Sequence, residues 1–241
     1  MNLVLTMAGK YQRFRDEGFK IPKYLLPWGP RSILGEIIYS LNGTGKCFKN
    51  IYLVVNKEDE RYMPHVRSIM RSLDIPISNL FLVADTKGQA ETARLSVSNI
   101  QKRFGEMRGN LVFHNIDTLL YNRSMKGISD ALKSNSGYID IFISSNHSYS
   151  YVLVQDGLVN RVAEKVVISD QATSGLYAFQ DAKVFTSFYM KNDEYIIDTY
   201  QRMIDANLQV AAGYLYSENE TIVLGTPTEF IDNSRVLDEK F

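Results

Sequence analysis

Short apolar runs alternate along the chain with stretches whose apolar residues have helical spacing. An apolar run of about four to eight residues has the length of a buried strand, whereas spacing of about three and four residues indicates one face of a helix. The runs predict strands over residues 3–7, 51–55, 80–83, 111–117, 138–143 and 210–214, and a hairpin over 151–159. The helical spacing predicts helices over 32–41, within 58–73, and over 89–103, 182–190 and 195–204. This alternation is typical of βαβ units around a mostly parallel sheet.

The size and charge of the chain narrow the class of protein. Its 241 residues, 45% of them hydrophobic, fit one large α/β domain better than two small ones. Lys plus Arg and Asp plus Glu number 27 each, so the chain lacks the net positive charge that drives non-specific binding to nucleic acid. The one cysteine, Cys47, excludes an intramolecular disulfide and a zinc site made of several cysteines.

Membrane and secretion signals are the next feature that the sequence addresses. No apolar run approaches the ~18 residues of a membrane-spanning helix. The N-terminus lacks the basic segment, apolar core and small-residue cleavage site of a signal peptide. We therefore expect a cytoplasmic protein with no membrane partner.

The first predicted strand leads into a loop that is rich in cations. Ala8 and Gly9 follow the strand, and the cations after them are Lys10, Arg13, Arg15, Lys20 and Lys23. A glycine lets backbone amides approach phosphate oxygens, and Arg can hold those oxygens in a bidentate fork. The stretch therefore predicts an anion-binding βα loop. The alternative is that a strand, a glycine and surface cations occur together without a ligand, as in many α/β proteins.

Two segments of this region resemble the N-terminal signature of the sugar-phosphate nucleotidyltransferases. Residues 6–14 read TMAGKYQRF and residues 22–27 read PKYLLP, beside the family patterns L-A-A-G-x-G-T-R-F and P-K-x-L-x-P. The resemblance implies that Arg13 and Lys23 flank the reacting phosphates. It also implies that the NTP phosphates are held by Met7, Ala8, Gly9 and Lys10.

The same segments depart from the family pattern at two positions. Tyr11 stands where the family has its second glycine, and Gln12 stands where it has Thr or Ser. Because a glycine permits close approach of the backbone to a phosphate, we expect the triphosphate cradle of this chain to have a different shape.

A second signature follows the third predicted strand. Residues 85–93 read DTKGQAETA, which resembles the family pattern G-[QTLH]-A-x-x at the start of a helix. The resemblance implies that the backbone near Gly88 and the side chain of Gln89 meet the nucleotide base, because Gln can both donate and accept hydrogen bonds. The alternative is that Gln89 and Thr92 only solvate the N-terminus of the helix.

The fourth predicted strand ends in a carboxylate, Asp117. Ligands of open parallel sheets gather at the carboxyl ends of the strands. Mg²⁺ favours one or two carboxylates together with phosphates and water, so Asp117 is a candidate ligand for Mg²⁺ or Mn²⁺, and the resemblance implies the same role. His114 lies three residues earlier, on the opposite side of a regular strand, so we expect it to be packed rather than metal-bound.

Two segments of the second half resemble the family's acceptor-binding patterns, G-x-V-x-x-x-x-E-K and G-x-Y-x-F. Residues 157–165 read GLVNRVAEK and residues 175–179 read GLYAF. The resemblance assigns the acceptor phosphate to Lys165 and acceptor hydroxyls to Glu164, and implies that Gly175 lets the backbone come near the acceptor. The alternative is an ordinary Glu-Lys pair on a solvent-facing strand.

The last matching segment covers residues 221–230, TIVLGTPTEF, which resembles W-x-D-x-G-T-P-E-D-L. Gly225, Thr226 and Pro227 match, but Val223 takes the place of the metal-binding Asp of that pattern. Asp117 is then either the sole carboxylate anchor or is joined by a substitute ligand from elsewhere.

These features together lead us to expect an α/β protein. Its fold is expected to be a single three-layer α/β/α, Rossmann-like domain with a mixed sheet of the glycosyltransferase-A type over residues 1–241. The resemblance implies a nucleotide-binding half over 1–120 and an acceptor-binding half over 121–241. It also implies a nucleotidyltransferase that joins an NTP to a phosphorylated small molecule and releases pyrophosphate, in bacterial surface polysaccharide biosynthesis.

Two other functions stay open at this point. A glycosyltransferase of the same architecture would normally need a carboxylate pair, whereas residues 115–117 offer only Asp117. A non-catalytic nucleotide-binding homologue is suggested by Tyr11 and Val223. The nucleotide base, the acceptor (a sugar, polyol or amine phosphate) and the formation of a homo-oligomer are left open.

Overall fold

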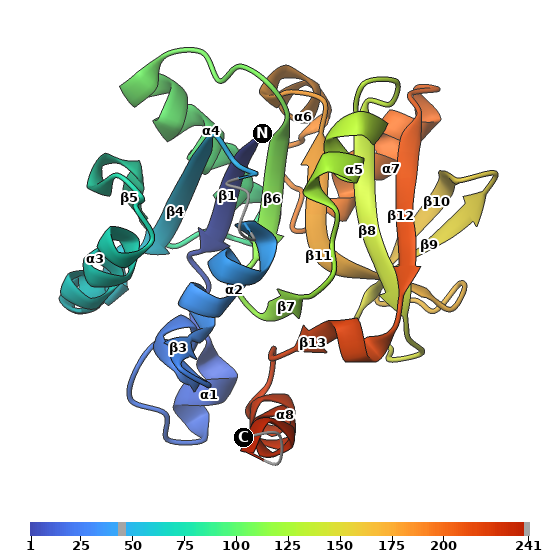
Figure 1. The fold of residues 1–241 in the computed structure, drawn as a ribbon. Coiled ribbons are helices and arrows are strands. Elements are labelled where there is room, and N and C mark those ends of the chain that lie inside the picture. The colour runs from blue at the N-terminus through green and yellow to red at the C-terminus, as the bar shows by residue number, and fades with distance from the viewer. Residues whose placement is uncertain (43–46, 239–241) are drawn as a thin grey trace.

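The computed structural model, which describes residues 1–42 and 47–238, is built around a nine-stranded mixed sheet (Figure 1). The strands follow one another across the sheet in the order β5 (Leu80–Val83), β4 (Asn50–Asn56), β1 (Asn2–Met7), β6 (Leu111–Asn115), β11 (Gln171–Phe179), β8 (Gly137–Ile143), β12 (Val210–Tyr216), β10 (Leu158–Glu164) and β9 (Ser150–Gln155). The first four are parallel, β11 is antiparallel to both β6 and β8, and β12 is parallel to β8. The predicted mixed sheet is therefore confirmed.

Helices cover both faces of this sheet. They are α2 (Ile33–Asn42), α3 (Met63–Ser72), α4 (Gln89–Phe104), α5 (Met125–Ala131), α6 (Ala182–Phe188) and α7 (Ile197–Asp205). Leu3 and Leu5 of β1 join one apolar core with Ile37 of α2, whereas Val4 joins a second core with Val97 of α4. Alternate residues of one strand thus face opposite helix layers, as a three-layer α/β/α fold requires.

The predicted elements lie close to the observed ones. Strand β6 ends at Asn115, so Asp117 lies just beyond it. The predicted hairpin is formed by β9 and β10, and its turn residues Asp156 and Gly157 have φ of 52° and 76°. Positive φ at both central residues is the geometry that matches the twist of a two-residue hairpin. Cys47 is exposed.

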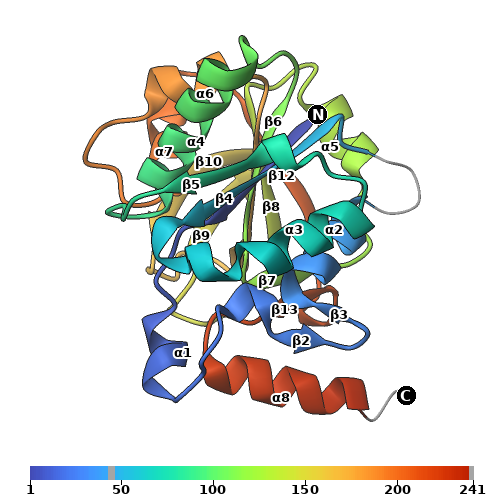
Figure 2. The ribbon, with the colours of Figure 1, turned by 90° about the vertical axis from the view of Figure 1, so that its left-hand side faces the viewer.

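Several short elements and one longer helix were not predicted. They are α1 (Gln12–Asp16), β2 (Pro27–Trp28), β3 (Arg31–Ser32), β7 (Thr118–Leu120), α5, β13 (Thr221–Val223) and α8 (Pro227–Asp238). Figure 2 shows α8 below the sheet, beside α1 and the β2–β3 hairpin. Phe230 of α8 packs there against Phe14 and Phe19, with ring centroids 6.4 and 6.0 Å away. Among the described residues, no helix is long and apolar enough to cross a membrane.

Candidate functional site

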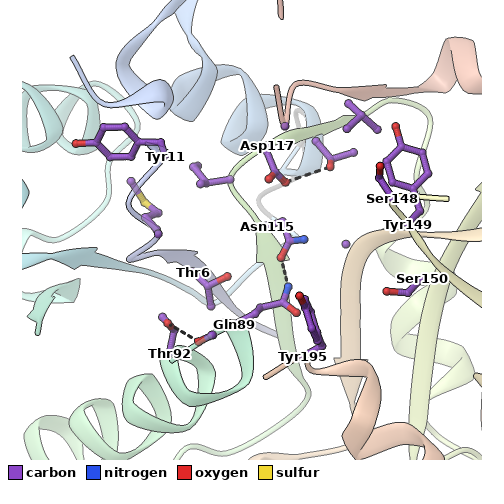
Figure 3. A pocket seen from close by; sticks show the side chains of 18 of the residues that line it. Thr6, Tyr11, Gln89, Thr92, Asn115, Asp117, Ser148, Tyr149, Ser150 and Tyr195 are labelled. Atoms are coloured by element: carbon purple, nitrogen blue, oxygen red, sulfur yellow. Dashed lines mark hydrogen bonds between the residues drawn. The ribbon is translucent and has the colours of Figure 1, made fainter. Parts of the chain in front are cut away.

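The sheet changes direction of winding between β1 and β6, and a cavity of about 560 Å³ lies at the carboxyl ends of these strands (Figure 3). Such switch points are where open α/β sheets bind ligands. The structure brings every site residue that the sequence predicted to the wall of this cavity: Met7, Ala8, Gly9, Lys10, Arg13, Lys23, Gly88, Gln89, Asp117, Glu164, Lys165 and Gly175. Two parts of the cavity wall are named for the strands that they adjoin. The β1 side consists of Gly9, Lys10, Arg13 and Lys23. The β10 side consists of Tyr149, Ser150, Glu164, Lys165 and Tyr195.

The three predicted glycines differ in what surrounds them. A Cβ added to Gly88 would come within 2.4 Å of the Glu194 carbonyl oxygen, and one added to Gly175 within 2.6 Å of Asn115 Nδ2. The packing of the protein itself therefore explains both glycines. A Cβ added to Gly9 would meet no described atom within 4 Å, although Gly9 lines the cavity. Close approach of a ligand to the backbone is the remaining physical reason for a glycine there.

The cations of the cavity differ in how they are held. Lys10 Nζ lies 2.5 Å from Asp85 Oδ2, and Lys23 Nζ lies 2.8 Å from Asp117 Oδ2. Lys165 Nζ donates to the Tyr195 hydroxyl at 2.6 Å. The side chain of Arg13 has no hydrogen bond or ion pair with any residue in the described parts of the chain. Its five donors are thus available to an anion that enters the cavity.

Asp117 is held in its charged form despite being largely covered. Burial alone would raise the pKa of Asp117, but the charge of Lys23 and its hydrogen bond outweigh this and hold the pKa below its usual value. Val223, in the place of the family's second metal ligand, pairs with Thr118 next to Asp117. Asp117 is therefore an ionised oxygen donor that faces the cavity beside an apolar neighbour.

Glu229 is a second carboxylate in this part of the cavity, and the sequence had not singled it out. A Cβ placed on Gly225 would lie 3.4 Å from Glu229 Oε2 and 3.8 Å from Asp117 Oδ2, so both carboxylates flank one glycine. Glu229 accepts hydrogen bonds from the Thr226 amide at 2.8 Å and from the Tyr149 hydroxyl at 3.2 Å. The Thr-Pro-x-Glu sequence is a capping box with proline at the first helical position, and this signal could have revealed α8 and Glu229.

These donors fit a divalent cation only if a ligand completes its coordination. The described residues contain no group of three or more His, Cys, Asp or Glu side chains that could hold a metal ion by themselves. One or two carboxylates with phosphate oxygens and water are, however, the donor set that Mg²⁺ prefers. Asp117, with Glu229 nearby, provides the protein part of such a set.

His114 is buried, as predicted, with none of its surface exposed. Its Nε2 lies 2.8 Å from the Thr118 carbonyl oxygen. Burial lowers the pKa of His114 to about 4, so the ring is neutral near pH 7.

Gln89 lines the cavity, but both ends of its amide already have partners in the protein. Its Nε2 donates to Asn115 Oδ1, and its Oε1 accepts from the Ile196 amide at 3.2 Å. Figure 3 shows Gln89 directed toward Asn115 at the end of β6. Gln89 therefore connects α4, β6 and the start of α7, and any contact with a nucleotide base would use its second donor or acceptor position.

Glu164 and Lys165 both reach the cavity although they are adjacent in sequence. Strand β10 ends at Glu164, and Lys165 has φ of 54°, so the regular alternation of a strand does not continue. The Ser150 hydroxyl donates to Glu164, and burial raises the pKa of this carboxyl. The hydrogen bond to Tyr195 raises the pKa of Lys165. Tyr149, Ser150 and Tyr195 had not been singled out, because only the fold brings them to the ends of β10.

Comparison with known proteins identifies the fold. No protein-family model and no curated protein matches the chain in sequence. A nucleoside-diphosphate-sugar pyrophosphorylase from Vibrio cholerae RC9 is 24% identical, with a TM-score of 0.84 over 97% of this chain and 99% of its own. An inositol-1-phosphate CTP transferase from T. maritima is 16% identical, with a TM-score of 0.70 over 95% and 90%. A UDP-glucose pyrophosphorylase is 15% identical, with a TM-score of 0.73 over 100% and 99%.

The likeness establishes the three-layer, glycosyltransferase-A-type fold that these solved structures share, over nearly the whole chain. The particular chemistry of this chain is a separate question, because function depends on the site rather than on the fold.

Proposed function

We propose that the protein is a nucleotidyltransferase that joins an NTP to a phosphorylated small molecule and releases pyrophosphate. The observation that carries the proposal is that residues predicted from widely separated segments line one cavity. Lys23, Gln89, Asp117 and Lys165 come from four separate regions of the chain, and the cavity lies at the switch point of the sheet. The fold is shared with structures named as enzymes of this reaction class.

In this reaction an oxygen of the acceptor phosphate forms a bond to the α-phosphorus of the NTP. The bond from that phosphorus to the oxygen that bridges it to the β-phosphorus breaks, and pyrophosphate leaves. A phosphate monoester is already anionic near neutral pH, so no side chain need act as a base. The protein supplies orientation and charge neutralisation, which dominate phosphoryl-transfer catalysis.

The β1 side of the cavity would hold the triphosphate. The backbone from Met7 to Lys10 would contact phosphate oxygens, with Gly9 permitting the close approach. Arg13, whose side chain has no partner in the described parts of the chain, would hold the leaving pyrophosphate in a bidentate fork. Lys23 would neutralise the reacting phosphates, since it crosses the cavity to Asp117. Gly88 and Gln89 would border the base.

We include Mg²⁺ or Mn²⁺ as the cofactor, held by Asp117 with Glu229 as a candidate second oxygen ligand. When bound, the ion would neutralise phosphate charge and help to orient the triphosphate. An ion held by Asp117 would take the place of Lys23 as the partner of this carboxylate, and the ammonium of Lys23 would then be available to phosphate oxygens.

The β10 side would bind the acceptor. Lys165 would contact the acceptor phosphate, and Glu164 would bond to its hydroxyl or amine groups. Gly175 would contribute indirectly, because it leaves room for the side chain of Asn115. A role in making nucleotide-activated units for bacterial surface polysaccharides is part of the proposal and depends on which acceptor the enzyme uses.

A matrix of nucleoside triphosphates and phosphorylated acceptors, read by pyrophosphate release, tests the proposal. Hexose, heptose, polyol and amine phosphates should each be combined with ATP, GTP, CTP, UTP and dTTP. We expect pyrophosphate only when both substrates are present. Transfer from a nucleotide-sugar without pyrophosphate release would favour a glycosyltransferase instead, and NTP binding without turnover on any acceptor would favour a non-catalytic homologue.

A further inference from the structure

The backbone of the cationic loop contains an unusual position. Tyr11 has φ of 40° and ψ of 43°, in the left-handed region. Glycine enters this region without strain, whereas a residue with a Cβ does so at a cost in free energy. Such conformations persist only where the surroundings hold them firmly. The question is therefore what holds Tyr11 between Lys10 and Arg13.

The restraint comes from a buried carboxylate, Asp59, in the 3₁₀-helix η2 (Lys57–Tyr62). The Tyr11 hydroxyl donates to Asp59 Oδ1, and the Tyr24 hydroxyl donates to Asp59 Oδ2 at 3.0 Å. Asp59 is only 1% exposed. Arg15 adds to the restraint, since its guanidinium lies 4.7 Å from the centroid of the Tyr11 ring and donates to the same hydroxyl at 3.2 Å.

The same segment holds the loop at two further points. Asn56 Nδ2 donates to the Ala8 carbonyl oxygen at 3.1 Å. The Tyr62 hydroxyl donates to the Lys20 carbonyl oxygen at 2.6 Å. The loop is thus fixed from its first residue to its last by one short segment, residues 56–62, that lies outside the motifs described above.

We infer that Asp59 is a positioning residue that fixes both ends of the cationic loop in the shape that receives a triphosphate. Tyr11 lies between Lys10 and Arg13, and Tyr24 directly follows Lys23, so one carboxylate sets the placement of these cations. The inference rests on the proposed function only for the identity of the ligand. It also explains how this chain accommodates tyrosine at a position where the sequence pattern led us to expect a glycine.

A buried carboxylate is an unfavourable way to provide stability alone. Burying an ionised group is unfavourable unless its oxygens receive strong hydrogen bonds. The two carboxylate oxygens of Asp59 accept hydrogen bonds from Tyr11 and Tyr24, two side chains of the same loop that are 13 positions apart in the chain. A restraint that joins two such positions limits the shapes of the whole segment between them, and this is the property that a preorganised anion site needs.

The test measures loop order and anion binding separately. Inorganic tripolyphosphate is the probe, because it requires no choice of nucleotide base. The variants are Asp59→Asn, Tyr11→Phe and Tyr24→Phe. Tyr200→Phe is the matched control, since it removes a fully buried tyrosine hydroxyl that bonds to the Ala178 carbonyl oxygen at 2.9 Å, away from the loop.

We expect each phenylalanine variant of the loop to bind tripolyphosphate roughly tenfold more weakly by calorimetry, the size typical of one lost hydrogen bond to a charged group. Hydrogen exchange over residues 9–25 should become faster in the same variants. Asp59→Asn combined with Tyr24→Phe should weaken binding by less than the sum of the two single losses, because both changes act on the same pair of hydrogen bonds. Tyr200→Phe should lower thermal stability without changing either reading.

Unchanged affinity and unchanged exchange in folded Tyr11→Phe and Tyr24→Phe would overturn the inference, whatever the stability of Asp59→Asn. A fall in melting temperature with unchanged affinity would also overturn it, because that result describes a purely structural contact. If the wild-type protein bound neither tripolyphosphate nor any NTP, the proposed function would fail. Faster exchange over residues 9–25 would then still support Asp59 as the restraint on the loop, and unchanged exchange would overturn it.

Discussion

The β1 side and the β10 side of the cavity differ in how much of the chain each draws on. The β1 side comes mainly from residues 7–24, a single strand end and the loop that follows it. The β10 side combines the start of β9 and the residue before it, the end of β10 and the residue after it, and the segment before α7. The β1 side can therefore be predicted from one stretch of sequence, whereas the residues of the β10 side come together only in the folded sheet.

Shifts in strand register are a further difference between the two sides. Strand β11 shifts register against β8 between Thr173 and Tyr177, and Gly175 within that interval has φ of 86°. Strand β10 shifts against β9 between Val159 and Arg161. Such bulges redirect side chains at the edges of functional sites. Under the proposed function, the residues that act on phosphates are encoded locally, and those that choose the acceptor depend on strand geometry.

The largest expected effect concerns Asp117, which lines the same cavity but belongs to neither side. Asp117→Asn should lower kcat/KM about a thousandfold, because loss of a metal anchor removes several kcal/mol of charge stabilisation. EDTA should abolish turnover and Mg²⁺ or Mn²⁺ should restore it. Asp156→Asn, at the exposed β9–β10 turn, is the control and should retain normal kinetics. Full turnover in EDTA would rule out the metal.

Metal binding in that experiment should also depend on the nucleotide. Since Val223 replaces a usual ligand, we expect weak Mn²⁺ binding to the free protein and tighter binding in the presence of an NTP. Paramagnetic resonance of Mn²⁺ measures this without turnover. Equal affinity in both states would show that the protein alone completes the metal site.

The next effect isolates the β1 side. Arg13→Ala and Lys23→Ala should each lower kcat/KM roughly a hundredfold, the scale for removal of one oriented donor to a transition state. The ranking of acceptors should stay the same, because neither residue belongs to the β10 side. Lys20→Ala, an exposed cation of the same loop, is the control. Near-normal turnover in both Arg13→Ala and Lys23→Ala would remove the loop from the mechanism.

A third prediction concerns β6, the strand that joins the halves. His114 lies between Leu5 of β1 and Leu176 of β11. Its pKa is lowered by burial to about 4, so between pH 6.5 and 4 the unfolded chain binds a proton that the folded chain does not. Stability should therefore fall as the pH falls, by about 2 kcal/mol from His114 between pH 7 and pH 5.

Urea unfolding at several pH values measures this effect. His114→Gln should lose less stability toward acid than the wild-type protein, and the exposed His65→Gln should behave like the wild type.

Because β6 belongs to the continuous sheet, both halves should unfold in one transition. Two separate transitions would show that the halves are independent units and would weaken the comparison made above.

The smallest effect isolates the β10 side. Lys165→Ala should weaken all phosphorylated acceptors alike, by roughly tenfold, the loss expected for one charged hydrogen bond at a partly exposed site. Glu164→Gln should instead change the ranking of acceptors, because a site built to bond a polar group penalises its absence. NTP affinity by calorimetry should hardly change in either variant. Impaired NTP binding with an unchanged acceptor ranking would assign these residues to the wrong substrate.

Much of the fold was predictable because its signals are local. The apolar runs of β1, β4 and β5 and the spacing in α4 follow from periodicity alone. Helix α8 was missed, although Thr226 and Glu229 form a capping signal at its start. The short β7 and β13 pair only with each other and depend on tertiary contacts rather than on a pattern of their own.

The residues of the candidate site were also predictable only where their signals are local. The glycine, arginine and lysine of the first loop all lie within residues 9–23 and have chemical properties suited to phosphate. No such sequence signal exists for Asp59, Tyr149 and Tyr195, because their roles depend on the residues that folding places beside them. The contact of Gln89 with a base stays a prediction: Gln89 lines the cavity, and its amide is bonded to Asn115 and Ile196.

The central claim is that an NTP and a phosphorylated acceptor meet across the two sides of this cavity. A label on the α-phosphorus of the NTP, in parallel with a label on the γ-phosphorus, tests it most directly. We predict that the α-label appears in the acceptor product and the γ-label in pyrophosphate, with neither released when the acceptor is omitted. Release of the γ-label as orthophosphate, or an α-label that never becomes joined to any acceptor, would contradict the claim.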